Sequence, residues 1–169
     1  MTPETTCCFT GHRPSRLPWG HDETDPRCLD LKNRLAKAVN DAYDQGCRHF
    51  ICGMAQGADL YFCETVLALR EVHPEVTVEA AVPFAGQADR WPQADRDRWA
   101  ALLDQCNYET MVQHHYTSGC MSRRNRYMVD KSSLLIAVYD RDPKGGTMNT
   151  LLYAQRQGLR IEILDVVSE

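Results

Sequence analysis

The sequence lacks both an apolar run of membrane length and an excess of positive charge. No uninterrupted hydrophobic stretch approaches the roughly 18 residues that a transmembrane helix needs. The formal net charge is −4, so no overall basic field attracts acidic membranes or nucleic acid. Residues 1–6 have neither the basic start nor the apolar stretch of a secretory signal. We therefore expect a cytoplasmic protein without a membrane partner, and we do not expect nucleic acid as its partner.

The sequence also lacks the signatures of common metal and catalytic sites. It contains 8 cysteines, yet no Cys-x-x-Cys pair occurs, which argues against zinc-ribbon and redox motifs. The scattered spacing favours reduced, mostly buried thiols, and we expect no metal and no cofactor. Gly-x-Ser-x-Gly and His-Glu-x-x-His are absent as well. Known catalytic motifs therefore identify no activity.

Apolar segments of strand length alternate with segments of helical periodicity along the whole chain. The expected strands are residues 6–10, 49–52, 76–82, 108–112, 134–139 and 161–164, and helical patterns lie between them. Neither internal repeats nor a long linker interrupt this alternation. The pattern predicts one domain over residues 1–169. Its class is α/β and Rossmann-like, a doubly wound, mostly parallel sheet of about six strands with helices on both faces.

Three of the expected strand-to-helix junctions carry residues of the kind that hold phosphates. They read Thr-Gly-His-Arg at 10–13, Gly-Met-Ala-Gln-Gly-Ala-Asp at 53–59 and Asp-Arg-Asp-Pro-Lys-Gly-Gly-Thr at 140–147. In an open parallel sheet such junctions meet at the carboxyl edge, where ligands bind. The N–H groups at the start of the following helices can bind an anion there. The junctions together predict a site for a nucleotide or another phosphorylated small molecule.

A fourth segment, residues 118–126, follows the fourth strand and opens a helix at the same edge. Arg123 and Arg124 lie in the first two turns of that helix. They are candidates for phosphate binding, and a solvated basic helix face is the alternative. For the glycines the alternative is a turn that merely needs their backbone freedom. The expected ligand-binding residues are Gly11, His12, Arg13, Gly53, Gly57, Asp59, Arg123, Arg124, Gly145, Gly146 and Thr147.

These motifs occur in an order that resembles the SLOG superfamily, which groups the DNA-processing protein DprA with the LOG phosphoribohydrolases. The resemblance lies in Thr-Gly-His-Arg-Pro at 10–14, residues 53–59, Arg-Asn-Arg-Tyr-Met-Val-Asp at 124–130 and Gly-Gly-Thr at 145–147. Within the superfamily the chain is most similar to the YpsA/YoqJ-type family of small bacterial proteins. The resemblance covers nearly the whole chain. It implies a Rossmann-like fold, a nucleotide or nucleotide-derived ligand and a homodimer.

The chain also resembles the LOG enzymes, whose two motifs read Met-x-x-Arg-Lys-x-x-Met and, later in the chain, Pro-Gly-Gly-x-Gly-Thr-x-x-Glu. Residues 121–128 match the first motif, with Asn125 in place of Lys. Gly146 and Thr147 match the Gly-Thr of the second, which puts Thr150 where the family has its catalytic Glu. Cleavage of an N-glycosidic bond passes through a cationic sugar, which a carboxylate stabilises and a threonine does not. The resemblance therefore favours binding over this hydrolysis.

Three functions stay open at this point. The first is binding or sensing of a nucleotide or nucleotide-derived phosphorylated ligand at the carboxyl edge. The second is a nucleotide-processing hydrolase with a non-standard carboxylate, in which Arg124 and Asp140 are the catalytic candidates and Asp59 is another carboxylate within the motifs. The third is DprA-like binding of single-stranded DNA, which needs a basic groove and stacking aromatic side chains.

Overall fold

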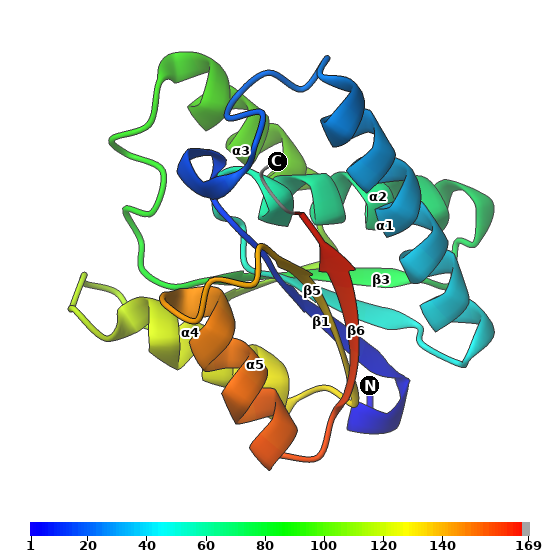
Figure 1. Ribbon diagram of the computed structural model, residues 1–169. Helices are drawn as coiled ribbons and strands as arrows, with labels where there is room; N and C mark the ends of the chain where they lie inside the picture. The colour runs from blue at the N-terminus through cyan, green and yellow to red at the C-terminus, as the bar shows by residue number, and fades with distance from the viewer. Residues whose placement is uncertain (167–169) are drawn as a thin grey trace.

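The computed structural model describes residues 1–166, which form a six-stranded sheet with helices on both faces (Figure 1). Every neighbouring pair of strands is parallel, so the sheet is entirely parallel where the sequence predicts a mostly parallel one. The strand order is β4-β3-β2-β1-β5-β6. The strands are β1 (Thr6–Thr10), β2 (His49–Cys52), β3 (Thr77–Val82), β4 (Tyr108–Met111), β5 (Leu134–Tyr139) and β6 (Arg160–Asp165).

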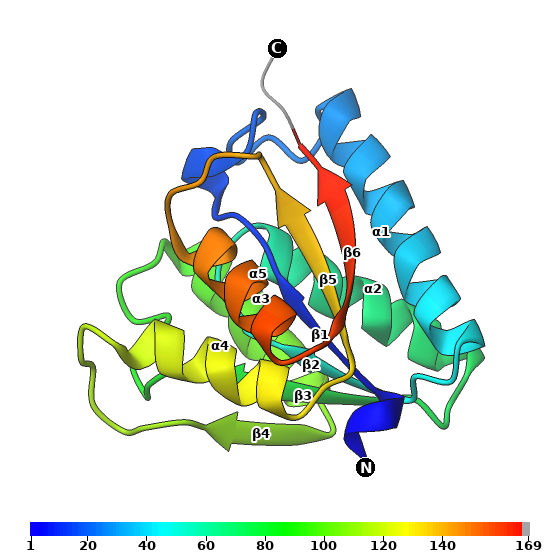
Figure 2. The same cartoon turned by 60° about the horizontal axis from the view of Figure 1, so that its bottom comes forward.

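The helices divide between the two faces of the sheet according to the direction in which the chain winds. Those that follow β1, β2 and β3 pack against one another on one face, and those that follow β4 and β5 pack together on the other (Figures 1 and 2). This division confirms the doubly wound α/β prediction. The helices are α1 (Pro26–Asp44), α2 (Ala58–Val72), α3 (Gln93–Gln105), α4 (Cys120–Asp130) and α5 (Gly146–Arg156).

The centre of the sheet is buried on both sides, as its uninterrupted apolar runs require. Cys8 of β1 is aligned with Ile51 of β2 and Leu135 of β5, and all three are fully buried. On the α1–α3 side the rings of Phe9 and Phe62 stack with their centroids 4.6 Å apart. These strands therefore form a fixed platform for the loops at their carboxyl ends.

The cysteines serve as small apolar residues of this core. All eight are free thiols; seven are buried and Cys106 is half-buried. Burial raises the pKa of the Cys8 thiol to about 12, so it stays protonated at neutral pH. None of the helices in the described part of the chain is long and apolar enough to cross a membrane.

Glu79 of β3 is a buried carboxylate that ties α4 to the sheet. Its side chain accepts hydrogen bonds from the Tyr127 hydroxyl at 2.5 Å and the Thr110 hydroxyl at 2.9 Å. His49 Nε2 lies 2.8 Å from its other oxygen. Burial favours the neutral acid, but these three partners outweigh it and lower the pKa of Glu79. The ionised carboxylate therefore holds β2, β3, β4 and α4 together.

We predict that Glu79→Gln lowers the free energy of unfolding by about 1–3 kcal/mol at pH 7, because a buried hydrogen-bonded charge is removed. The folded-state pKa lies below the ordinary value of 4.5. Glu79 therefore stabilises the fold above pH 4.5, and this contribution disappears as the pH falls through the folded-state pKa. Urea unfolding followed by circular dichroism at several pH values measures both effects.

The matched control is Glu109→Gln, the same change at an exposed position of the neighbouring strand β4. It should alter the free energy of unfolding by no more than about 0.5 kcal/mol. Equal effects of the two substitutions would contradict a structural role for the ionised Glu79.

Candidate functional site

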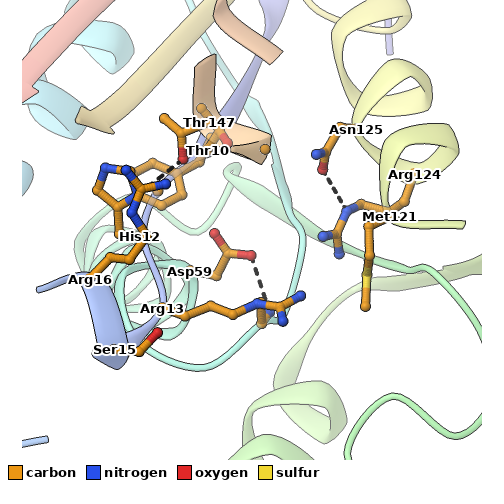
Figure 3. Close-up of a pocket in the computed structure, with 14 residues that line it drawn as sticks. Thr10, His12, Arg13, Ser15, Arg16, Asp59, Met121, Arg124, Asn125 and Thr147 are labelled. Atoms are coloured by element: carbon orange, nitrogen blue, oxygen red, sulfur yellow. Dashed lines mark hydrogen bonds between the residues drawn. The ribbon is translucent and has the colours of Figure 1, made fainter. Parts of the chain in front are cut away.

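The sheet reverses its winding direction between β1 and β5, and a cavity lies at that point. The chain passes from β1 outward to β4 and then returns to place β5 beside β1. Ligands of open parallel sheets bind where such a reversal opens a crevice beyond the carboxyl ends of the strands. The cavity measures about 190 Å³ (Figure 3). Its lining consists of Phe9, Thr10, Gly11, His12, Arg13, Ser15, Arg16, Ala55, Asp59, Met121, Arg124, Asn125, Gly146 and Thr147.

Arg124 of α4 is a buried cation that lines this cavity without a carboxylate partner. Its side chain is 4% exposed. Nη1 donates to the carbonyl of Gly53 and, at 3.4 Å, to that of Ala81, while Nε donates to Asn125 Oδ1 at 2.8 Å. Within residues 1–166, Nη2 makes no hydrogen bond and the guanidinium forms no ion pair. Burial lowers the pKa of Arg124, although the nearby charge of Asp59 acts in the opposite direction.

Asp59, at the start of α2, lies beside Gly53, next to the same face that Arg124 contacts. One carboxylate oxygen accepts a hydrogen bond from the Ala55 N–H at 3.1 Å, and the residue is 6% exposed. Burial raises the pKa of Asp59, although the charges of Arg124 and Arg13 act in the opposite direction. A Cβ added to Gly53 would lie 2.9 Å from both the Arg124 guanidinium carbon and the Asp59 oxygen. Glycine therefore leaves room for the two charged groups to approach the backbone, and a larger residue would make one of them shift.

Arg13 supplies a second cation from the loop after β1. Its side chain is exposed, and its guanidinium has no hydrogen bond or ion pair with the rest of the described chain. Figure 3 shows Arg13 and Arg124 extending from different elements toward the space beside Asp59. Two arginines and one buried carboxylate thus meet at the cavity.

His12 connects the first junction to the third. Its Nε2 accepts a hydrogen bond from the Asp140 N–H at 3.0 Å, and its Nδ1 lies 3.4 Å from the Thr147 hydroxyl. The same Nε2 also lies 3.2 Å from the Asp140 carboxylate. Burial lowers the pKa of His12 despite the neighbouring Asp140 carboxylate, in agreement with a neutral ring. His12 is buried here, and its partners belong to the β5–α5 loop and to the first turn of α5.

Arg16 fixes the loop between β5 and α5. Its guanidinium contacts the carboxylates of Asp140, at 3.0 Å, and Asp142, at 3.2 Å, and it donates to the Lys144 carbonyl at 2.9 Å. Gly145 has a φ of 104°, and a Cβ there would lie 2.5 Å from Arg16. Asp140 is consequently engaged in this ion pair and does not line the cavity.

The structure brings seven of the eleven predicted ligand-binding residues to the cavity wall: Gly11, His12, Arg13, Asp59, Arg124, Gly146 and Thr147. Three further glycines shape the wall from behind. Gly53 lies beneath Arg124, Gly57 has a φ of 84° and would clash with the His12 carbonyl if it carried a Cβ, and Gly145 borders Arg16. Arg123 lies apart, on the exposed side of α4, where it donates to Gln113.

Four polar residues of the wall were not predicted to bind ligand: Thr10, Ser15, Arg16 and Asn125. The sequence around Arg16 does not indicate that this residue lines the cavity, because its partners are more than 120 residues away. The choice between the adjacent arginines Arg123 and Arg124 does have a signal in the sequence. Cys120, Arg124 and Met128 follow one another at intervals of four residues and form one buried stripe. Arg123 falls beside that stripe.

Two residues other than glycine adopt positive φ at this edge. Met54 (φ 63°) directly follows Gly53 beyond β2, and Arg141 (φ 66°) follows Asp140 beyond β5. Such conformations cost free energy and cluster at ligand sites, where the surrounding structure maintains them. Within the described residues no group of three or more His, Cys, Asp or Glu side chains is arranged to hold a metal ion.

We predict that Gly53→Ala lowers the free energy of unfolding by about 1–3 kcal/mol, because its Cβ forces the Arg124 guanidinium or the Asp59 carboxylate to move. Chemical unfolding measures the change. Gly146→Ala is the matched control, since a Cβ there meets nothing within 4 Å and alanine favours the first turn of α5. If both variants were as stable as the unsubstituted protein, the close approach at Gly53 would not be a constraint.

Comparison with known proteins agrees with the motifs. A family model named YpsA and described as the YspA SLOG family matches residues 7–166. A UPF0398 protein of Bacillus velezensis is 27% identical over 150 residues, 88% of this chain and 82% of that protein. For the UPF0398 protein YpsA of Bacillus subtilis the identity is 27% over 156 residues, 88% and 83% of the two chains. The SPbeta prophage-derived protein YoqJ of Bacillus subtilis is 30% identical over 146 residues, 78% of this chain and 84% of its own. The match to the family model spans nearly all of the chain, and the protein belongs to the YspA SLOG family.

Proposed function

We propose that the protein binds a nucleotide or nucleotide-derived phosphorylated ligand in the cavity between the carboxyl ends of β1 and β5. The observation that carries the proposal is the buried Arg124, which lines the cavity with one guanidinium nitrogen unpaired and no carboxylate in contact. Burial of a charge without a contacting counter-ion is costly, and such a cost is expected where a ligand supplies the opposite charge.

The other groups of the wall suit the parts of a phosphorylated nucleoside. Arg13 adds a second guanidinium, whose planar shape matches a phosphate. The first turn of α5, with Gly146 and Thr147, presents backbone N–H groups to the same space. Asp59 is a hydrogen-bond acceptor between these donors and suits the hydroxyls of a sugar. A phosphate with its sugar would thus compensate both cations and satisfy the carboxylate.

The positions of the carboxylates favour binding over hydrolysis. Thr150, which stands where the resemblance to LOG enzymes implies a catalytic Glu, is buried and donates its hydroxyl to the Gly146 carbonyl at 2.9 Å. Asp140 is held by Arg16 outside the cavity lining. Asp59 is the acidic residue in the lining, so hydrolysis of the ligand would depend on it.

We predict that Arg124→Met lowers the affinity for nucleoside 5′-monophosphates by about 10-fold or more, because charge-assisted hydrogen bonds to phosphate are lost. The melting temperature of the free protein should fall, because the hydrogen bonds of Arg124 to the Gly53 and Ala81 carbonyls are lost. Isothermal titration with AMP, GMP, CMP and UMP measures affinity, and differential scanning calorimetry measures stability.

Arg123→Met is the matched control, because it removes the neighbouring arginine of the same helix outside the cavity. Its affinities should stay within about twofold of those of the unsubstituted protein. The proposal is wrong if none of the four monophosphates binds, or if the two substitutions weaken binding equally.

We predict that the bound nucleotide is recovered intact after prolonged incubation with the protein at a concentration above its dissociation constant. Chromatography with detection of free base and ribose 5-phosphate measures this. Products that form with the unsubstituted protein and not with Asp59→Asn would favour the hydrolase alternative, with Asp59 as its acid–base group.

A further inference from the structure

A second cavity, of about 450 Å³, lies between α4 and α5 and adjoins the first. The two share Met121, Asn125 and Gly146 in their walls, so they form a continuous depression. The second is lined mainly by hydroxyl, amide and basic side chains. Its lining is Ser118, Met121, Ser122, Asn125, Arg126, Val129, Gly146, Asn149, Thr150, Leu152, Tyr153 and Arg156. We call this second cavity the α4–α5 groove.

The charge of the α4–α5 groove is positive, although the protein as a whole is acidic. Arg126 and Arg156 are its charged residues, and no acidic side chain belongs to its lining. Neither guanidinium forms a hydrogen bond or an ion pair with any described residue. In a chain with a formal net charge of −4, a lining of this kind favours an anionic occupant.

The two arginines are positioned by an aromatic ring. The Arg126 guanidinium lies 5.2 Å from the centre of the Tyr153 ring and that of Arg156 lies 6.0 Å from it. The Tyr153 hydroxyl donates to Asp130 at 2.5 Å, which anchors the ring. Asp130 lines the neighbouring surface beside β4 and not the groove itself. The ring contacts leave the N–H groups of both arginines available to a ligand.

We propose that the α4–α5 groove binds a second anionic group of the same ligand, so that the ligand is a short molecule of dinucleotide length with at least two phosphates. This inference rests on the proposed nucleotide site at Arg124. From Gly146, in the shared wall, to Arg156 the helix rises about 15 Å, which is longer than a phosphoribosyl group needs. The groove ends with the last residue of α5, which favours a short ligand over a long nucleic-acid strand.

The test compares two probes of one base: the nucleoside 5′-monophosphate that binds best and the corresponding 5′-phosphorylated dinucleotide. We expect the dinucleotide to bind the unsubstituted protein about 10-fold more tightly, because its second phosphate reaches Arg126 and Arg156. The double variant Arg126→Gln/Arg156→Gln should lose this gain and bind the monophosphate within about twofold of the original affinity. Isothermal titration at low and moderate salt measures the affinities, and salt should weaken the gain.

The control Arg96→Gln/Arg123→Gln removes the same charge from exposed positions outside both cavities and should keep the gain. Equal affinity of the protein for the two probes would overturn the second subsite while leaving the site at Arg124 intact. Equal losses in the two double variants would also overturn it, since the effect would then be one of overall charge. A further large rise in affinity with a single-stranded decanucleotide would contradict the short ligand. If neither probe binds, the proposed function fails together with the extension.

Discussion

The carboxyl edge of the sheet depends on the contact between the Arg124 guanidinium and the backbone of Gly53. The carbonyl at Gly53 receives donors from two sides, Arg124 from α4 and Gln87 at 3.1 Å. Gln87 in turn accepts a hydrogen bond from the Trp99 indole of α3 at 3.2 Å. One carbonyl therefore links helices on both faces of the sheet. The absence of a side chain at Gly53 allows this, because any Cβ would occupy the space of the guanidinium.

Helix α4 takes part in two buried interactions that involve a charge. In one the charged group has hydrogen-bond partners that keep it ionised, and in the other the charged group has no carboxylate in contact. Tyr127 of α4 donates to Glu79, a carboxylate with three partners that keep it ionised. Arg124, one turn earlier, has carbonyl and amide partners and no carboxylate. The first interaction anchors α4 to the sheet, and the second then holds a cation in a fixed position at the cavity. Such preorganisation spares a ligand the cost of ordering the side chain.

The fold and part of the site follow from local sequence, and the remainder depends on contacts between distant segments. The apolar run of β5 and the glycines after β2 and before α5 are recognisable within their own segments, because burial and backbone geometry are local requirements. Arg16 and His12 are different, since their partners belong to the β5–α5 loop. The burial of Arg124 can be predicted only in part from its local sequence. Its four-residue spacing from Cys120 and Met128 marks the buried stripe, yet a basic residue on a helix is expected in solvent.

Arginines without a carboxylate partner gather at the carboxyl edge of the sheet. This edge is therefore locally positive, although the formal net charge of the chain is −4. Arg98 and Arg141 each contact carboxylates, and these pairs stabilise loops and helices away from the cavity. Arg13, Arg124 and the pair in the α4–α5 groove lie along the two adjoining cavities without such partners. Arg13, Arg126 and Arg156 are exposed, as Arg96 is elsewhere on the surface, so water surrounds them at little cost, whereas Arg124 is buried. Cations that share a concave wall repel one another, and this repulsion is relieved when an anion enters. The proposed anionic ligand would relieve this repulsion most at Arg124, the buried member of the set.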